Sequence, residues 1–172
     1  MNLYTTDYNT TNCVRALDDY LLGRTIVESA QMISTAINFN PKIKIKPDGL
    51  YKNYNAHEEH NMWVRESKYN FKWTFMYLMD ALREYTYRFN GPHKCWKIAK
   101  LAGMLDIYFP DIPMSPFPKT FKKTLPEFDA LMRIKDPCEA YRSYLNVRWK
   151  EMADDNRPPE WTKREPPEWY IR

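Results

Sequence analysis

The chain has 172 residues and a mass of 20.8 kDa, which predicts one domain large enough to bury a core. Hydrophobic residues make up 44% of it, so the composition excludes wholesale disorder despite a mean hydropathy of −0.72. Only 4 glycines stand against 13 prolines, which argues against glycine-rich phosphate loops. The formal net charge of +4 permits nucleic acid as a partner without demanding it.

The cysteines and the N-terminal residues bear on the compartment. Cys13, Cys95 and Cys138 show no Cys-x-x-Cys spacing, so they predict neither a disulfide framework nor a thiolate zinc site. Residues 1–12 lack a basic and apolar leader, and no apolar run approaches the roughly 20 residues that cross a bilayer. We therefore expect a soluble cytoplasmic protein that binds no membrane.

Helical periodicity is clearest directly after the polar residues 2–12. Asp18 or Asp19 is well placed near the start of a helix, because a negative charge is stabilised at a helix N-terminus. An apolar stripe then recurs at helical spacing, at Leu22, Ile26, Ala30, Ile33 and Ile37. A polar stripe lies beside it on the same helix, at Arg24, Glu28, Gln31 and Thr35. Any chemistry on this helix is expected on the polar stripe.

Three further helices are predicted. The central one covers 61–89, a shorter one covers 94–105, and the last begins at Asp136-Pro137 and ends near Met152. Four prolines exclude regular structure from the segment that follows the shorter helix, at Pro110, Pro113, Pro116 and Pro118. The sequence thus predicts an all-α fold of about four helices with long proline-rich loops.

The C-terminal segment repeats itself. Residues 157–161 and 165–169 both end in Pro-Pro-Glu-Trp, which favours two extended arms that each present a tryptophan. We predict a globular domain over 1–156 and an extended tail over 157–172 that packs on it. In the simplest interpretation Trp161 and Trp169 attach this tail to the body.

Two histidines three residues apart, His57 and His60, suggest a metal site with a nearby carboxylate. A zinc site needs a third ligand, and the spacing differs from the His-Glu-x-x-His pattern. We expect no metal and no cofactor, and we interpret both histidines as polar residues at a helix start.

Glu28 is the carboxylate with the most chemical interest. It lies four residues after Arg24 and beside an apolar stripe, so partial burial could tune its pKa for proton transfer. The alternative is an ordinary i, i+4 surface pair. Basic and aromatic residues also alternate along the chain, for example around Trp63-Val-Arg65. Such clusters suit a nucleic-acid surface, but they also build aromatic cores covered by lysine stems.

Two pieces of the first half of the chain resemble a known family. The opening Met1-Asn2-Leu3-Tyr4, followed by Leu17-Asp18 and Glu28, is similar to the first helix of the pyrimidine-dimer DNA glycosylases of the phage endonuclease V type. Residues 54–60, followed by Trp63 and Arg65, are similar to the segment that leads into the central helix of that family. The Leu-Asp-Asp and Glu-Ser-Ala-Gln patterns also resemble phage-encoded proteins.

The resemblance implies an all-α DNA glycosylase with abasic-site lyase activity on a damaged or modified pyrimidine in duplex DNA. It implies an N-terminal α-amine, here that of Met1, as the nucleophile; such amines have pKa values near 8 and are partly neutral at pH 7. Glu28 matches the catalytic glutamate of the family. We expect contacts with DNA or the sugar from Arg24, His60, Arg65 and Lys68.

The chain also departs from the family pattern. Positions at which the phage enzyme has arginines hold Val27 and Gln31. The alternative is therefore a phage protein without enzymatic activity, which keeps the fold and binds a nucleotide or a host protein. A short distance between the α-amine of Met1 and Glu28 would favour the enzyme.

Overall fold

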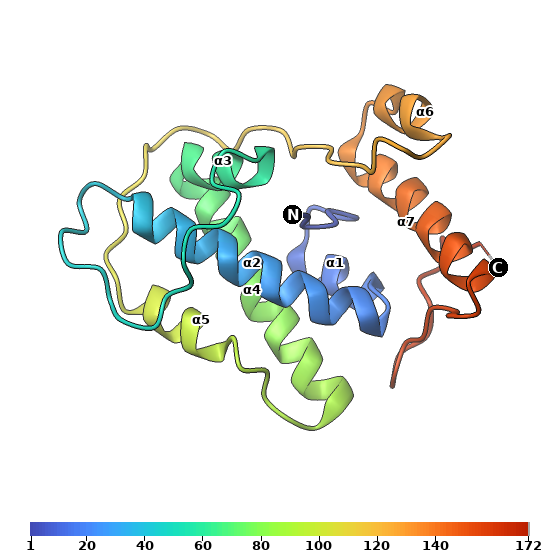
Figure 1. The fold of residues 1–172 in the computed structure, drawn as a ribbon, viewed down its shortest axis with the longest axis horizontal. Helices are drawn as coiled ribbons and strands as arrows, with labels where there is room; N and C mark the ends of the chain where they lie inside the picture. Colours follow the sequence, from blue (N-terminus) through green and yellow to red (C-terminus); the bar gives the residue numbers. More distant parts are fainter. Residues whose placement is uncertain (172) are drawn as a thin grey trace.

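The computed structural model describes residues 1–171, and every regular element within them is a helix. The all-α class is therefore confirmed. Figure 1 shows the seven helices: α1 (Thr10–Ala16), α2 (Asp19–Phe39), α3 (Glu59–Glu66), α4 (Lys68–Phe89), α5 (Trp96–Gly103), α6 (Phe128–Arg133) and α7 (Pro137–Asp154). No helix in this part of the chain is both long and apolar enough to cross a membrane.

Helix α2 contributes more buried residues than any other helix and packs chiefly against α4. It begins where the sequence predicts, because the Asp18 side chain accepts hydrogen bonds from the backbone N–H groups of Tyr20 and Leu21. All five residues of the predicted apolar stripe are completely buried. The polar stripe, expected beside it, lies instead on the opposite side of the helix: Arg24 and Glu28 reach the surface there, whereas Thr35 is completely buried.

The expectation of about four helices needs correction, since residues 1–171 contain seven. The predicted central helix is two helices, α3 and α4, which are separated at Ser67. Ser67 has extended backbone angles, and its hydroxyl accepts a hydrogen bond from the N–H of Asn70. A serine side chain that caps one helix interrupts a longer periodic pattern. Helices α1 and α6 are additional, and each is too short to give a clear apolar period.

Helix α7 lies apart from α1–α5 in Figure 1, and the N-terminal segment lies between them. Leu3 and Thr5 in this segment are completely buried. The carbonyl of Thr6 accepts a hydrogen bond of 2.8 Å from Arg142 of α7, and Tyr4 contacts the aromatic cluster of that helix. The first residues of the chain therefore fill the space between α2 and α7.

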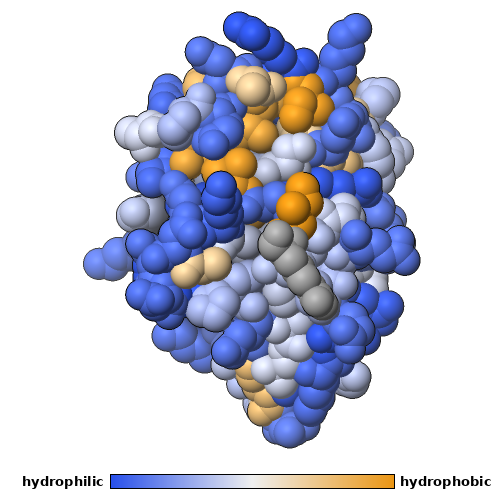
Figure 2. Space-filling view, turned by 90° about the vertical axis from the view of Figure 1, so that its right-hand side faces the viewer, coloured by the Kyte–Doolittle hydropathy of each residue, from blue (hydrophilic) through white to orange (hydrophobic). Residues whose placement is uncertain are grey.

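The C-terminal tail packs on the same side of the molecule. The rings of Trp161 and Trp169 lie 5.2 and 5.4 Å from that of Trp149 in α7. The carbonyl of Glu160 accepts a hydrogen bond of 2.8 Å from the N–H of Asp19 at the start of α2. Arg172 lies outside the described residues. Figure 2 shows this face: it is largely hydrophilic, with apolar surface gathered toward the end where α6 lies.

Candidate functional site

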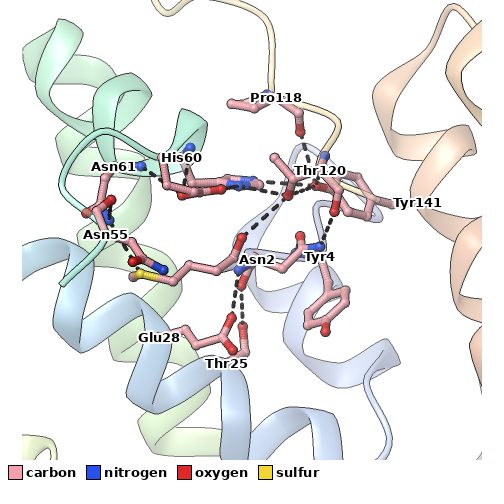
Figure 3. Close-up of polar contacts among 12 residues, drawn as sticks. Asn2, Tyr4, Thr25, Glu28, Asn55, His60, Asn61, Pro118, Thr120 and Tyr141 are labelled. Atoms are coloured by element: carbon pink, nitrogen blue, oxygen red, sulfur yellow. Dashed lines mark hydrogen bonds and ion pairs between the residues drawn. The ribbon is translucent and has the colours of Figure 1, made fainter. Parts of the chain in front are cut away.

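The N-terminal segment is attached directly to the polar stripe of α2. The backbone N–H of Asn2 donates a hydrogen bond of 2.6 Å to Oε2 of Glu28. The Asn2 side-chain amide donates a second hydrogen bond, of 2.8 Å, to the carbonyl of Thr120. The backbone carbonyl of Asn2 accepts a third one from the Thr25 hydroxyl at 3.5 Å. Figure 3 shows Asn2 at the centre of these contacts. Three separate segments therefore hold the peptide that follows Met1.

A buried polar network supports this attachment from behind. His60 and Tyr141 are completely buried. Thr120 Oγ1 lies 3.1 Å from Nδ1 of His60 and 3.4 Å from the carbonyl of Met1, to which it donates. The Tyr141 hydroxyl donates to the Pro118 carbonyl at 3.1 Å and lies 3.4 Å from Nε2 of His60 (Figure 3). His60 and Tyr141 thus hold the loop residue Thr120 in position, and Thr120 in turn forms hydrogen bonds with Met1 and Asn2.

A turn in the segment places Tyr4 beside the same site. Its φ of 42° lies in the left-handed region, which bulky residues rarely adopt. The side chain of Asn2 stabilises the turn, since its Oδ1 accepts a hydrogen bond of 3.2 Å from the N–H of Tyr4. Burial, and then the nearby charge of Glu28, raise the pKa of the Tyr4 hydroxyl. Tyr4 is therefore a neutral side chain close to Glu28.

A hollow of about 690 Å³ opens over this part of α2. It is lined by the N-terminal residue, one face of α2 and the loop before α3, namely Met1, Asp19, Tyr20, Gly23, Arg24, Val27, Glu28, Gln31, Tyr54 and Asn55. The bonds between the nitrogens of Met1 and Asn2 sum to about 4.3 Å, so the Met1 α-amine lies within about 7 Å of Glu28 Oε2. Met1 and Glu28 thus share one solvent-accessible space.

Two more side chains set the electrostatics of the hollow. Arg24 donates to Oε1 of Glu28 at 3.1 Å and to the Tyr20 hydroxyl at 3.2 Å. These hydrogen bonds, first the one to Tyr20 and then the one to Glu28, raise the pKa of Arg24, which therefore stays charged. Burial alone would raise the pKa of Glu58, but the hydrogen bond and charge of His60 and the positive N-terminus lower it. Glu58 is thus a second carboxylate close to the α-amine.

The structure brings together three of the six residues singled out in the sequence. Met1, Arg24 and Glu28 line the hollow. His60 has no exposed surface, and its contacts place it behind the N-terminal segment rather than on a DNA-binding surface.

The other two lie outside the hollow. Arg65 donates to the carbonyl of Ala56 and lies over the ring of Phe39, while Lys68 pairs with Asp111.

Several residues of the site carry no signal in the sequence. Thr120 and Tyr141 come from a loop and a helix more than fifty residues beyond α3, and only the fold brings them to Asn2. Glu58 caps α3 although glutamate is not among the preferred capping residues, so the sequence carries no clear signal for it. It accepts hydrogen bonds from the N–H groups of His60 and Asn61.

No group of three or more metal-ligating side chains occurs within residues 1–171. Comparison of the chain with family models, with curated proteins and with solved structures finds no match.

Proposed function

We propose that the protein is a DNA glycosylase with abasic-site lyase activity, which acts on a damaged or modified pyrimidine through the α-amine of Met1. The observation that carries this proposal is the hydrogen bond between Asn2 N–H and Glu28, because it holds the α-amine and a carboxylate in one hollow. The family resemblance assigns the same two groups to catalysis.

The chemistry requires a nucleophile and a base on one sugar. The α-amine nitrogen forms a bond to C1′ while the bond from C1′ to the base breaks and the base leaves with a proton. Opening of the C1′–O4′ bond, with a proton from water going to O4′, leaves an imine cation between the chain and the sugar. Glu28 then takes a proton from C2′, and the C3′–O bond breaks, so that the following strand leaves with the phosphate as its 5′ phosphate.

Arg24 supports this division of roles. Its hydrogen bond to Oε1 and the Asn2 hydrogen bond to Oε2 together fix the orientation of the Glu28 carboxylate. The side chain of Glu28 is 15% exposed, which leaves it accessible from the hollow. A carboxylate that is held in place and accessible is suited to removing a proton from a bound sugar.

The test is covalent trapping with borohydride, which reduces an imine to a stable secondary amine. The protein is incubated with a duplex that contains one abasic site and with duplexes that contain modified pyrimidines. We expect a complex whose peptide mass map places the DNA on Met1. The intact mass of the free protein first establishes that Met1 carries the α-amine. A trapped complex on a lysine instead of Met1 would contradict the proposed nucleophile.

A second function is favoured by one other observation. A second hollow, of about 820 Å³, lies elsewhere, between the N-terminal half of α4, residues 8–10 and the segment 111–114. Tyr69, Trp73 and Met114 are among the apolar side chains that line it. This feature fits the alternative of a non-enzymatic protein that binds a nucleotide or a host protein. Absence of trapping with every duplex, together with saturable binding of a nucleotide, would favour the alternative.

A further inference from the structure

The basic residues are distributed very unevenly. Residues 41–53 and 94–101 contain seven lysines and one acidic residue, Asp48, which together carry a formal charge of +6. The whole chain carries +4, so the remaining residues sum to −2. We call these two segments the lysine surface; its lysines are Lys42, Lys44, Lys46, Lys52, Lys94, Lys97 and Lys100.

The two segments form one continuous surface although they are distant in the sequence. The hydroxyl of Tyr51 lies 3.3 Å from Sγ of Cys95, and Lys97 Nζ lies 5.6 Å from the centre of the Tyr51 ring. A Cβ atom placed on Gly49 would lie 3.6 Å from Leu101 of α5. Figure 1 shows the loop between α2 and α3 running beside α5.

The charges of the lysine surface are available to a partner. Six of its lysines are exposed, and none of the seven enters an ion pair within residues 1–171. The seventh, Lys46, is only partly exposed, and its ammonium group donates hydrogen bonds to the carbonyls of Ile37 and Asn40 at the end of α2. Elsewhere many cations are neutralised: Arg148, for example, pairs with Glu151 at 2.6 Å.

The lysine surface reaches the candidate site. Asn53 accepts a hydrogen bond of 3.0 Å from Asn38 of α2, which attaches the end of the loop to the helix that carries Glu28. Tyr54 and Asn55, the next two residues, line the hollow with Met1. Lys52 is therefore only two residues along the chain from the rim of this hollow.

From this arrangement we infer that the lysine surface is where the protein binds the phosphate backbone of DNA, leading one nucleotide into the hollow at Met1 and Glu28. The inference rests on the proposed function for its choice of DNA as the polyanion. Duplex DNA carries one negative charge per about 1.7 Å of helix axis, so closely spaced lysines without internal partners suit it. The hollow itself is lined by Arg24 and by two carboxylates, Asp19 and Glu28, so its own side chains supply little net attraction for phosphates.

The experiment compares two charge-matched triple variants. Lys94→Gln/Lys97→Gln/Lys100→Gln removes three charges from α5. Lys123→Gln/Lys135→Gln/Lys150→Gln removes three exposed and unpaired charges from the part of the chain after residue 120. Binding of an unmodified duplex is measured by fluorescence anisotropy at several salt concentrations, from about 50 to 200 mM. Both variants keep Lys46 and every residue that lines the hollow.

We expect the α5 variant to lose on the order of tenfold in affinity at low salt, with its salt slope reduced by about 2.7. The control variant should bind like the original protein. Equal losses in both variants would overturn the inference, because net charge alone would then explain binding. Binding to vesicles with anionic headgroups, but to no duplex, would overturn it as well.

Failure of this inference and failure of the proposed function have different signatures. Binding to an unmodified duplex involves no imine, so a reduced salt slope in the α5 variant supports the inference even if borohydride traps nothing. Trapping on Met1 that is as efficient in the α5 variant as in the original protein, at about 150 mM salt, overturns the inference and leaves the proposed function standing.

Discussion

The N–H of Asn2 and the carboxylate of Glu28 are joined by a hydrogen bond of 2.6 Å across 26 residues of sequence. This bond links the first peptide of the chain to the middle of its most buried helix. The other oxygen of Glu28 accepts a hydrogen bond from Arg24, so both oxygens of the carboxylate are held. The same carboxylate therefore holds the N-terminal segment in place and is the proposed catalytic base. A substitution that tests catalysis has to preserve the hydrogen bond to Asn2.

Glu28→Gln separates these roles because it keeps the size of the side chain and an acceptor for the Asn2 N–H while removing the ionisable proton. We expect turnover on an abasic duplex to fall by roughly a hundredfold or more. The free energy of unfolding should fall by only about 1 kcal/mol, since a neutral hydrogen bond replaces a charged one. Both quantities are measured on the same purified variant.

Glu127→Gln is the matched control, because Glu127 is exposed and makes no side-chain capping bond. It should change neither quantity. A Glu28→Gln protein that keeps its activity would remove Glu28 from the mechanism, and with it the main support that the resemblance gives to the enzyme.

Ile33→Ala tests the contact between α2 and α4. Ile33 is completely buried in the main core, so truncation leaves a cavity that costs about 2 to 5 kcal/mol. Ile45→Ala is the control, because its side chain is 88% exposed and should change stability by less than about 0.5 kcal/mol. Urea denaturation gives both values. A loss of only a few tenths for Ile33→Ala would mean that α2 is not packed as described.

The helices that could be predicted from the sequence are those with strong local signals. Helix α2 has an N-cap at Asp18 and an unbroken apolar period, and α7 has Asp136 followed by Pro137 at its first position. Both begin within a residue of the predicted start. Such caps act within one turn of the chain, which is why sequence alone reveals them. The residues that line the hollow from α2 follow from the same periodicity.

The N-terminal segment shows what local signals cannot provide. Its threonines and asparagines favour an irregular surface loop, yet Thr5 and Thr6 are buried. They are buried because α7 returns more than 130 residues later and covers them, as the hydrogen bond from Arg142 to Thr6 shows. His60 is a second example. It is a polar residue at a helix start, and it is buried beside Thr120 and Tyr141, which are distant in the sequence.

Trp161→Ala tests whether the tail contributes to the fold. Trp161 packs against the ring of Trp149, and its Nε1 donates to the carbonyl of Ala16 at 3.0 Å. We expect a loss of about 3 kcal/mol in the free energy of unfolding. Trp161→Phe keeps one aromatic ring but loses the hydrogen bond and part of the contact area of the indole, so it should cost less than Trp161→Ala, about 1 to 2 kcal/mol. An alanine variant that unfolds at the same urea concentration as the original protein would show that the tail is not docked in solution.

Glu84 predicts how stability depends on pH. Its carboxylate is 5% exposed and accepts hydrogen bonds from Arg88 at 2.8 Å and from Arg164 of the tail at 2.9 Å. Burial alone would raise the pKa of Glu84, but the hydrogen bonds and charges of Arg164 and Arg88 lower it below the ordinary 4.5. A lowered pKa means that the ionised form stabilises the folded state. This contribution is complete above about pH 4.5 and is lost as the pH falls through the folded-state pKa.

Glu84→Gln should therefore destabilise the protein by about 3 kcal/mol at pH 7, because two arginines lose their carboxylate partner. The difference from the original protein should shrink as the pH falls below 4.5 and through the lowered folded-state pKa, until Glu84 is protonated in both states. Urea midpoints measured across this range give the difference directly. Glu165→Gln, at an exposed position of the tail, is the control and should leave the pH profile unchanged. Profiles for Glu84→Gln and the original protein that stay parallel down to the lowest pH would mean that the ion pairs of Glu84 do not stabilise the fold.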